Sequence, residues 1–196
     1  MSDPAYLKAF KDYTRDDPTF HDLPAMEREF YGEADRPAAI LQAAVVEEAL
    51  KAAISRKLAP TLPSNFVKEL FEFEGTIGSF SDRIKIAYAL GIFGNQTYND
   101  LKIIRALRNA FAHQRKPMQF ATLQIAGMCQ HLRIPDIAGV SHAPHAYYEQ
   151  ARDLQAATDK TNPKTRYVTA CHSIAIGLLT FANQNPHAPF DKAMLP

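Results

Sequence analysis

The sequence has few of the features that mark several classes of protein. Its 196 residues include no tryptophan and only two cysteines, and 22 lysines and arginines stand against 21 aspartates and glutamates, a formal net charge of +1. A near-neutral chain is not expected to bind nucleic acid through a global basic field, so any such binding has to be local. Cys129 and Cys171 lie in apolar contexts without Cys-x-x-Cys spacing, which favours reduced thiols in a cytosolic core.

No hydrophobic run is long enough to cross a membrane. The most apolar stretch, residues 174–182, is far shorter than the ~20 residues that a transmembrane helix needs. Residues 1–11 contain Asp3, Pro4 and Lys8 and no continuous apolar stretch, so they do not look like a signal peptide. We therefore expect a soluble, cytoplasmic protein with no membrane association.

The usual metal and nucleotide motifs are also missing. A zinc site needs three or four ligands at fixed spacing, whereas His142 and His145 lie in a proline-rich stretch with no cysteine pair beside them. Cys171 and His172 are adjacent, so on a helix their side chains point roughly 100° apart and do not form a nucleophile and base pair. No Gly-Lys-Ser or Gly-Lys-Thr occurs. The sequence predicts no metal and no cofactor.

Helical periodicity is what the sequence does contain. It predicts an all-α, single-domain bundle of about five to seven helices, long enough to enclose one core. The body spans residues 37–184, with an N-terminal extension of short turns packed on it (1–36) and a C-terminal tail (185–196). Residues 135–145 are expected to be an irregular connection. The helical segments are 35–58, 66–73, 82–90, 97–112, 121–132, 146–159 and 162–183.

Several helix starts carry capping signals. Asp35 is expected to cap the first long helix, with Pro37 in its early turn, and Asn162-Pro163 to open the last one. Ser79 or Ser81 is expected to cap the helix predicted at 82–90. A helix-turn-helix around residues 90–97 is disfavoured. The most regular face of its second helix is an apolar stripe that is expected to be buried, whereas a DNA-reading helix must be exposed.

Glu47 and Glu48 follow an alanine-rich stretch, residues 38–46, that is apolar nearly all round and typical of a helix enclosed by others. Two interpretations stay open. Either the pair lies on a solvated face, where Glu47 contacts Lys51 one turn further on, or it provides the partner of a buried arginine.

The most informative stretch is the basic segment, residues 102–116, which contains no acidic residue. Within it, Arg108, Asn109 and His113 are the ingredients for cleaving RNA without metal. A guanidinium can hold the scissile phosphate and stabilise its developing charge, while an imidazole moves a proton. The alternative is a purely structural role, in which Arg108 pairs with a carboxylate such as Glu47 and His113 hydrogen-bonds to the backbone at a helix end. The cations of the segment are Lys102, Arg105, Arg108, Arg115 and Lys116.

Helical geometry limits the catalytic interpretation. Five residues along a helix rotate by about 140°, so Arg108 and His113 do not converge on one substrate within a continuous helix. Either the helix ends near Ala112, or a second subunit completes the site across a two-fold axis.

A set of separately spaced residues lies between about 38 and 114: Gly75, Gly78, Ser81, Asp82, Arg83, Lys85, Tyr88, Leu90, Gly91, Tyr98, Asp100, Leu107, Arg108 and His113. This set resembles the signature of the bacterial mannitol operon repressor (MtlR) family. The resemblance implies an all-helical, oligomeric regulator of a sugar-alcohol operon. The segment from Arg108 to His113 is also similar to the arginine-histidine motif of HEPN domains, which implies catalytic Arg108 and His113 with Asn109 in support.

We therefore expect a non-enzymatic bacterial transcriptional regulator of the mannitol operon repressor type, acting as a homodimer through protein or nucleic-acid partners. The alternative is a metal-independent endoribonuclease of toxin or defence type, with Arg108 and His113 at a dimer interface. If nucleic acid is bound, the expected contacts are Lys102, Arg105, Arg115 and Lys116.

Overall fold

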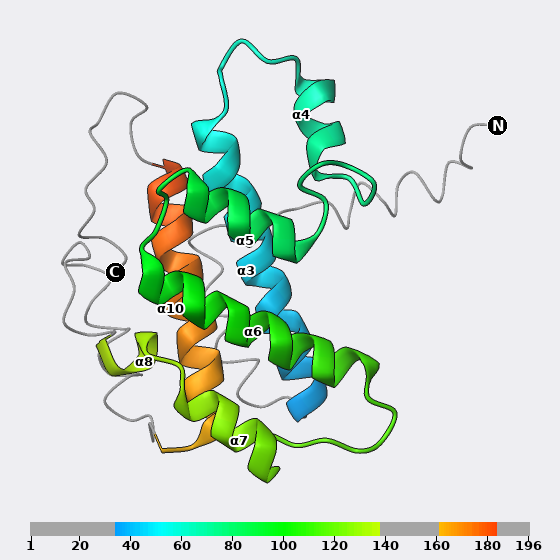
Figure 1. Cartoon of the computed structure of the whole chain (residues 1–196), viewed down its shortest axis with the longest axis vertical. Helices are drawn as coiled ribbons and strands as arrows, with labels where there is room; N and C mark the ends of the chain where they lie inside the picture. The colour runs from blue at the N-terminus through cyan, green and yellow to red at the C-terminus, as the bar shows by residue number, and fades with distance from the viewer. Residues whose placement is uncertain (1–33, 138–160, 184–196) are drawn as a thin grey trace.

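The protein is a bundle of helices. The computed structural model describes residues 34–137 and 161–183, and in these ranges it contains seven helices and no strand, which confirms the predicted all-α class (Figure 1). The helices are α3 (Asp35–Lys57), α4 (Ser64–Phe71), α5 (Phe80–Ala89), α6 (Asn95–His113), α7 (Leu123–Gln130), α8 (Ile134–Ile137) and α10 (Pro163–Asn183).

The two long helices α3 and α10 form the centre of the bundle, lying side by side and running in the same direction (Figure 1). At their starts, the Tyr167 hydroxyl of α10 donates to the Ala39 carbonyl of α3 at 2.8 Å. At their ends, the Lys57 ammonium of α3 lies 5.5 Å from the ring centroid of Phe181. Of the alanines predicted to let α3 be enclosed, Ala38, Ala39 and Ala43 are buried, but Ala44 is exposed, as is Leu41 beside it, so α3 is covered on one side rather than all round.

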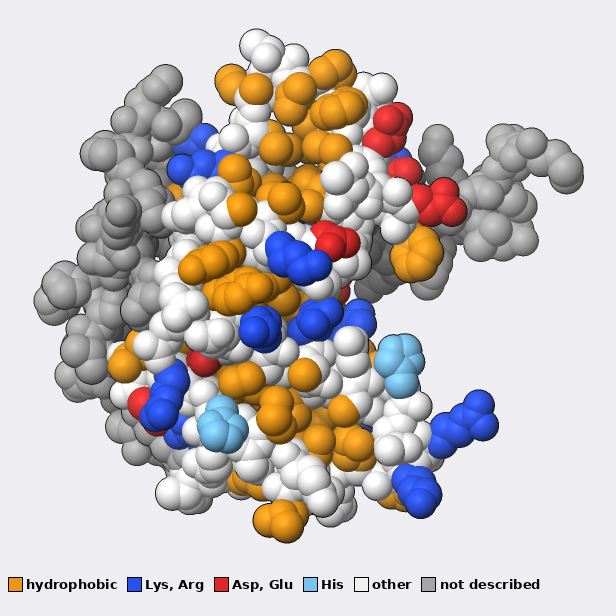
Figure 2. Space-filling view, in the orientation of Figure 1, with side chains coloured by type: hydrophobic (Ala, Val, Ile, Leu, Met, Phe, Trp, Pro, Cys, Tyr) orange, Lys and Arg blue, Asp and Glu red, His pale blue; other side chains and the backbone are white. Residues whose placement is uncertain are grey.

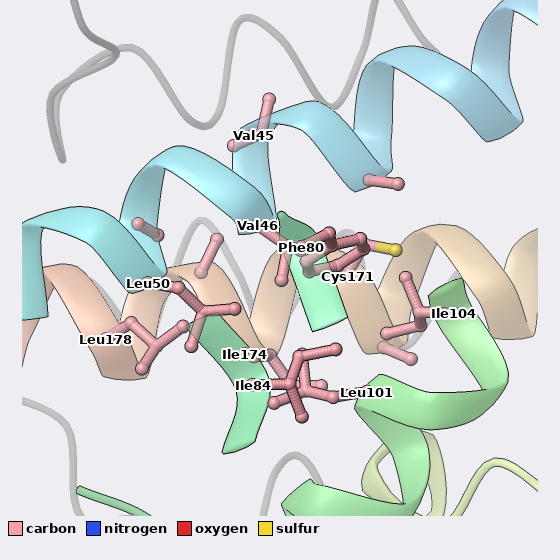
Figure 3. Packing of buried hydrophobic residues seen from close by; sticks show 14 of the residues in the cluster. Val45, Val46, Leu50, Phe80, Ile84, Leu101, Ile104, Cys171, Ile174 and Leu178 are labelled. Atoms are coloured by element: carbon pink, nitrogen blue, oxygen red, sulfur yellow. The ribbon is translucent and has the colours of Figure 1, made fainter. Parts of the chain in front are cut away.

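Helices α5 and α6 cross one side of this pair and bury their apolar stripes against it (Figure 1). In the close view, Ile84 of α5 and Leu101 of α6 approach Ile174 of α10, and Leu50 of α3 lies near Leu178 (Figure 3). These four helices provide most of the core, to which α4, α7 and α8 add Phe71, Ile125, Cys129 and Ile134. The face of α6 that a helix-turn-helix reader would expose is partly buried in it.

Buried polar groups fasten the shorter helices. The Asp100 carboxylate of α6 accepts the backbone N–H groups of Arg133 and Ile134 at 2.8–3.1 Å, which satisfies amides at the start of α8. The Arg166 guanidinium of α10 donates to the carbonyls of Cys129 and Leu132 and pairs with Asp136. These contacts connect α6, α7, α8 and α10.

The predicted caps were right in two of three places. The Ser79 hydroxyl accepts the Asp82 amide at 3.1 Å, and the Asn162 side chain accepts the amides of Lys164 and Thr165. The Asp35 prediction was wrong, because Ala34 is the N-cap and Asp35 lies inside the first turn of α3. The Asp35 carboxylate instead accepts the backbone N–H of Phe120 at 2.8 Å, so its charge fixes the chain that leaves α6.

Residues 134–137 are helical rather than irregular, with Ile134 and Pro135 buried. Both cysteines are unpaired and fully buried, which confirms the predicted core thiols. Burial raises the pKa of Cys129 to about 12 and that of Cys171 still further. The expected turns before residue 34, the helix at 146–159, His142, His145 and the tail after residue 184 lie outside the described residues.

Candidate functional site

The basic segment begins on α6 and continues past its end. Lys102, Arg115 and Lys116 are exposed, whereas Arg105 and Arg108 are half-buried. On the face that Figure 2 shows, lysine and arginine side chains lie beside exposed hydrophobic ones. The segment is thus a real surface feature, and its cations do not all have the same environment.

Arg108 is held by its own chain. Its guanidinium lies 3.7 Å from the Glu47 carboxylate of α3, and its Nη1 donates to the Asn109 side-chain oxygen at 3.0 Å. About a third of the side chain is exposed. This pairing with Glu47 is the structural alternative that the sequence left open for Arg108.

His113 is the last residue of α6 and is exposed. Its ring makes no hydrogen bond with other described residues, so the backbone contact expected at the helix end is not seen among them. Because α6 is continuous from Arg108 to His113, the two side chains point about 140° apart. The structure of one chain does not bring the candidate catalytic pair together.

The backbone after α6 is fixed by a cation from α3. The Arg36 guanidinium donates to the carbonyls of Phe111 at 2.6 Å, Gln114 at 2.9 Å and Lys116 at 3.1 Å. The last carbonyls of a helix lack intrahelical donors and carry partial negative charge, so a guanidinium stabilises this end. Arg115 and Lys116 therefore extend from an anchored backbone.

A second charged group, the Arg83 cluster (Glu47, Glu48 and Arg83), lies between α3 and α5. Arg83 is buried, and its Nη1 lies 3.1 Å from Glu48 and 3.8 Å from Glu47. It also donates to the backbone carbonyls of Glu47, Phe71 and Ile77. Glu48, rather than Glu47, pairs with Lys51. The buried-arginine interpretation of these glutamates was therefore right and the Glu47–Lys51 pairing wrong.

The two glutamates respond oppositely to their surroundings. Burial raises the pKa of Glu47 above its ordinary value, although Arg83 and Arg108 pull it down. Burial also pushes the pKa of Glu48 upward, but the hydrogen bond and charge of Lys51, together with Arg83, outweigh that effect and leave the pKa lowered. Glu48 is the better-compensated anion.

An aromatic stack covers the join between α5 and α6. The rings of Tyr88 and Tyr98 lie 4.4 Å apart between centroids, and Phe93 continues the stack beyond Tyr88. The Lys102 ammonium lies 5.4 Å from the Tyr98 ring centroid. At this distance a cation is attracted to the ring, so Lys102 is positioned rather than free to sweep through solvent.

Several of the residues that carry the MtlR resemblance have structural roles. Gly91 ends α5 with a φ of +66°, a conformation that favours glycine, and Asp100 and Arg83 fasten backbone. Sequence reasoning missed Arg36, Arg166 and Tyr167, whose long-range contacts carry no local pattern. Among the residues that fasten backbone in this way, only Arg83 could have been recognised from the sequence, because it is a charged residue within an apolar stripe.

Metal ligation, membrane insertion and cavities also bear on function. Within residues 34–137 and 161–183, no three His, Cys, Asp or Glu side chains are grouped so that they could hold a metal ion. No helix in the described ranges is long and apolar enough to cross a membrane. A hollow of about 580 Å³ lies near the start of α6, away from His113; its lining residues are Asn95, Gln96, Asn99, Asp100, Ile103, His131 and Arg133.

The fold and this arrangement define an all-α bundle in which buried ion pairs fasten the helices and in which one chain does not assemble an arginine-histidine pair. The sequence model of the family described as mannitol repressor, MtlR, matches residues 40–177. The chain belongs to the mannitol repressor family.

Curated relatives agree over a shorter stretch. The mannitol operon repressors of Escherichia coli strain K12 and strain O6:H1 are each 33% identical to this chain over 61 residues. That stretch is 31% of this chain and 31% of each relative, so the chain matches about a third of their length.

A solved structure shares the fold. The X-ray structure of the MtlR–HPr complex from Escherichia coli aligns with a TM-score of 0.55 and 20% identity, covering 79% of this chain and 99% of the matched chain. At this identity the likeness concerns the fold alone.

Proposed function

We propose that this chain is a non-enzymatic bacterial transcriptional regulator of the mannitol operon repressor type. The observation that carries the proposal is the family match across residues 40–177, which includes every helix of the central bundle in whole or in part. The names of the relatives support the same activity. In this proposal the protein acts in the cytoplasm, as a homodimer, through a partner macromolecule.

A protein partner is the better supported class. The relative with the same fold was solved as a complex of MtlR with HPr, so this fold can present a surface to another protein. The near-neutral charge of the chain also disfavours a general affinity for nucleic acid. The basic segment remains the place where nucleic acid would bind, through Lys102, Arg105, Arg115 and Lys116.

Deletion of the gene in its own host tests the regulatory role. We expect transcripts of the operon that the protein represses to rise in the deletion strain and to return to wild-type levels when the gene is restored. Transcription that is unchanged across the genome by deletion, growth on sugar alcohols included, would contradict the proposal.

The ribonuclease alternative has less support. Arg108 is engaged by Glu47, and His113 points away from it on the same helix. Incubation of mixed RNA with the protein in EDTA is expected to give no cleavage. Cleavage by the wild type that is lost in both Arg108→Ala and His113→Ala would overturn the non-enzymatic assignment and require a site shared between subunits.

A further inference from the structure

A phenylalanine at the tip of a tight turn is almost completely exposed. The Phe73 loop, residues 72–78, connects α4 to α5, and the Phe73 side chain has 96% of its surface in solvent. Phe71, two residues earlier, is buried, with the Arg83 guanidinium 5.6 Å from its ring centroid. The chain therefore places one ring in the interior and holds the next one out.

The backbone of this loop is closely packed. The amide of Gly75 donates to the Glu72 carbonyl at 2.8 Å, and that of Gly78 donates to Gly75 at 3.0 Å. A Cβ on Gly75 would lie 2.2 Å from the Glu69 carbonyl oxygen, and one on Gly78 would lie 2.1 Å from the Glu72 carbonyl oxygen. Only glycine fits such approaches of backbone to backbone, so the turn depends on both residues.

Arg83 fastens the loop to the core. Its Nη2 donates to the Phe71 carbonyl at 3.2 Å and its Nε to the Ile77 carbonyl at 3.3 Å, one on each side of the exposed ring. The same guanidinium is paired with Glu48 of α3. Phe73 is thus presented by a preorganised turn, and preorganisation lowers the entropic cost of binding.

The charges around the ring restrict what can bind it. Glu72 and Glu74 flank Phe73 and are exposed, as is Glu69 on the last turn of α4, while Lys68 approaches Glu72 only at 3.9 Å. Phosphates of nucleic acid or of anionic lipids would be repelled here. An aromatic anchor within an acidic rim is complementary to a protein pocket edged by Lys and Arg.

We propose that the Phe73 loop is a docking element for a separate protein that offers an apolar pocket with a basic rim. The proposal rests on the proposed function to this extent: it names the surface through which a regulator of this family meets a protein partner. It assigns a role to Gly75, Gly78 and Arg83 of the family signature, which hold the anchor in place.

Site-directed photo-crosslinking in the native host tests the occupant. The full chain would carry the photoreactive analogue benzoylphenylalanine at position 73 or, as a matched control, at Leu123, which is 81% exposed at the start of α7. We expect illumination to join position 73 to one peptide of another protein, close to Lys or Arg residues, with no such product from position 123. A crosslink to residues 1–33 of the same chain, a crosslink to a second copy, or equal yields from both positions would overturn the proposal.

Binding of the purified, identified protein then tests the chemistry. We expect Phe73→Ala to weaken binding at least about 30-fold, the loss typical of a central aromatic anchor. The double variant Glu72→Gln, Glu74→Gln should weaken binding less and reduce its dependence on salt. Both variants should unfold at the wild-type temperature, because these side chains are exposed. Unchanged affinity in Phe73→Ala would overturn the proposal, whereas an unchanged operon in the deletion strain would count only against the transcriptional role.

Discussion

The Arg83 cluster and the basic segment meet at one carboxylate, Glu47, but differ in how their cations are used. Arg83 is 6% exposed and is bound by two carboxylates and three backbone carbonyls. Arg108 has one carboxylate contact at 3.7 Å and remains a third exposed. Buried charges must be fully paired to be tolerated, whereas a surface charge contributes little to stability and stays available to a partner. The comparison therefore separates residues that build the fold from residues that can act.

The largest expected effect on stability comes from replacing the buried Arg83. Arg83→Met should lower the free energy of unfolding by about 3–5 kcal/mol, because it leaves Glu47 and Glu48 without their shared cation and three carbonyls without a donor. The matched variant Arg115→Met, at an exposed position, should change it by less than about 0.5 kcal/mol. Urea unfolding followed by circular dichroism measures both. Equal effects of the two variants would break the comparison.

The buried His172 makes the stability of the fold depend on pH. Burial lowers the pKa of His172 from 6.5 to about 4, so between these values the unfolded chain binds a proton that the folded chain does not. The contribution of this residue is therefore present above pH 6.5 and is lost as the pH falls toward 4, by roughly 3 kcal/mol at most.

The variant His172→Gln should flatten this part of the stability profile relative to the wild type. Thermal unfolding at intervals from pH 7 to pH 4 measures the difference in slope. An unaltered slope in His172→Gln would show that other groups dominate acid destabilisation.

A smaller effect distinguishes the two glutamates. Glu48→Gln should cost about 1 kcal/mol, because it removes an anion that Lys51 and Arg83 stabilise. Glu47→Gln should stay within about 0.5 kcal/mol, since the raised pKa of Glu47 means that burial already penalises its charge. Paired urea titrations at pH 7 compare them, and the reverse order would place the main counter-ion of Arg83 at Glu47.

The smallest effect on stability is expected at the other end. Replacing Lys102, Arg105, Arg115 and Lys116 together by Gln should shift the free energy of unfolding by no more than about 0.5 kcal/mol in all, because these cations form no tight ion pair with any residue that the structure describes. If the segment binds phosphates, wild-type protein should be retained on immobilised DNA or RNA at low salt and the variant should not. Loss of retention with unfolding, or equal retention of both, would remove these residues from any nucleic-acid surface.

The helices could be predicted because each carries its own local pattern. Apolar periodicity placed α3, α5, α6 and α10 to within a few residues, and the signals at Ser79 and Asn162 mark helix starts that depend only on neighbouring residues. Asp35 failed for a tertiary reason: the Phe120 amide, 85 residues away, competes for its carboxylate. Capping rules describe local geometry and do not contain such a partner.

The candidate site was predicted less well, because composition does not report how a charge is used. The basic count in residues 102–116 identified a real surface, and the observed pairing of Arg108 with Glu47 was one of the two alternatives that the sequence left open. The contact of Lys102 with the Tyr98 ring was not predicted. The signature residues were visible in the sequence, whereas their structural roles depend on contacts between α3, α5 and the Phe73 loop. Nothing in the local sequence distinguished the buried Phe71 from the exposed Phe73.

The reaction rates of the two buried thiols would report how fast different parts of the bundle open. A thiol must reach solvent and lose its proton before it reacts with an alkylating reagent, and Cys129 and Cys171 do neither in the closed protein. Cys129 belongs to the peripheral α7, and Cys171 to the central α10. Pulse alkylation followed by mass spectrometry would therefore time two events in one molecule: the departure of an outer helix, and the separation of the parallel pair on which the others pack.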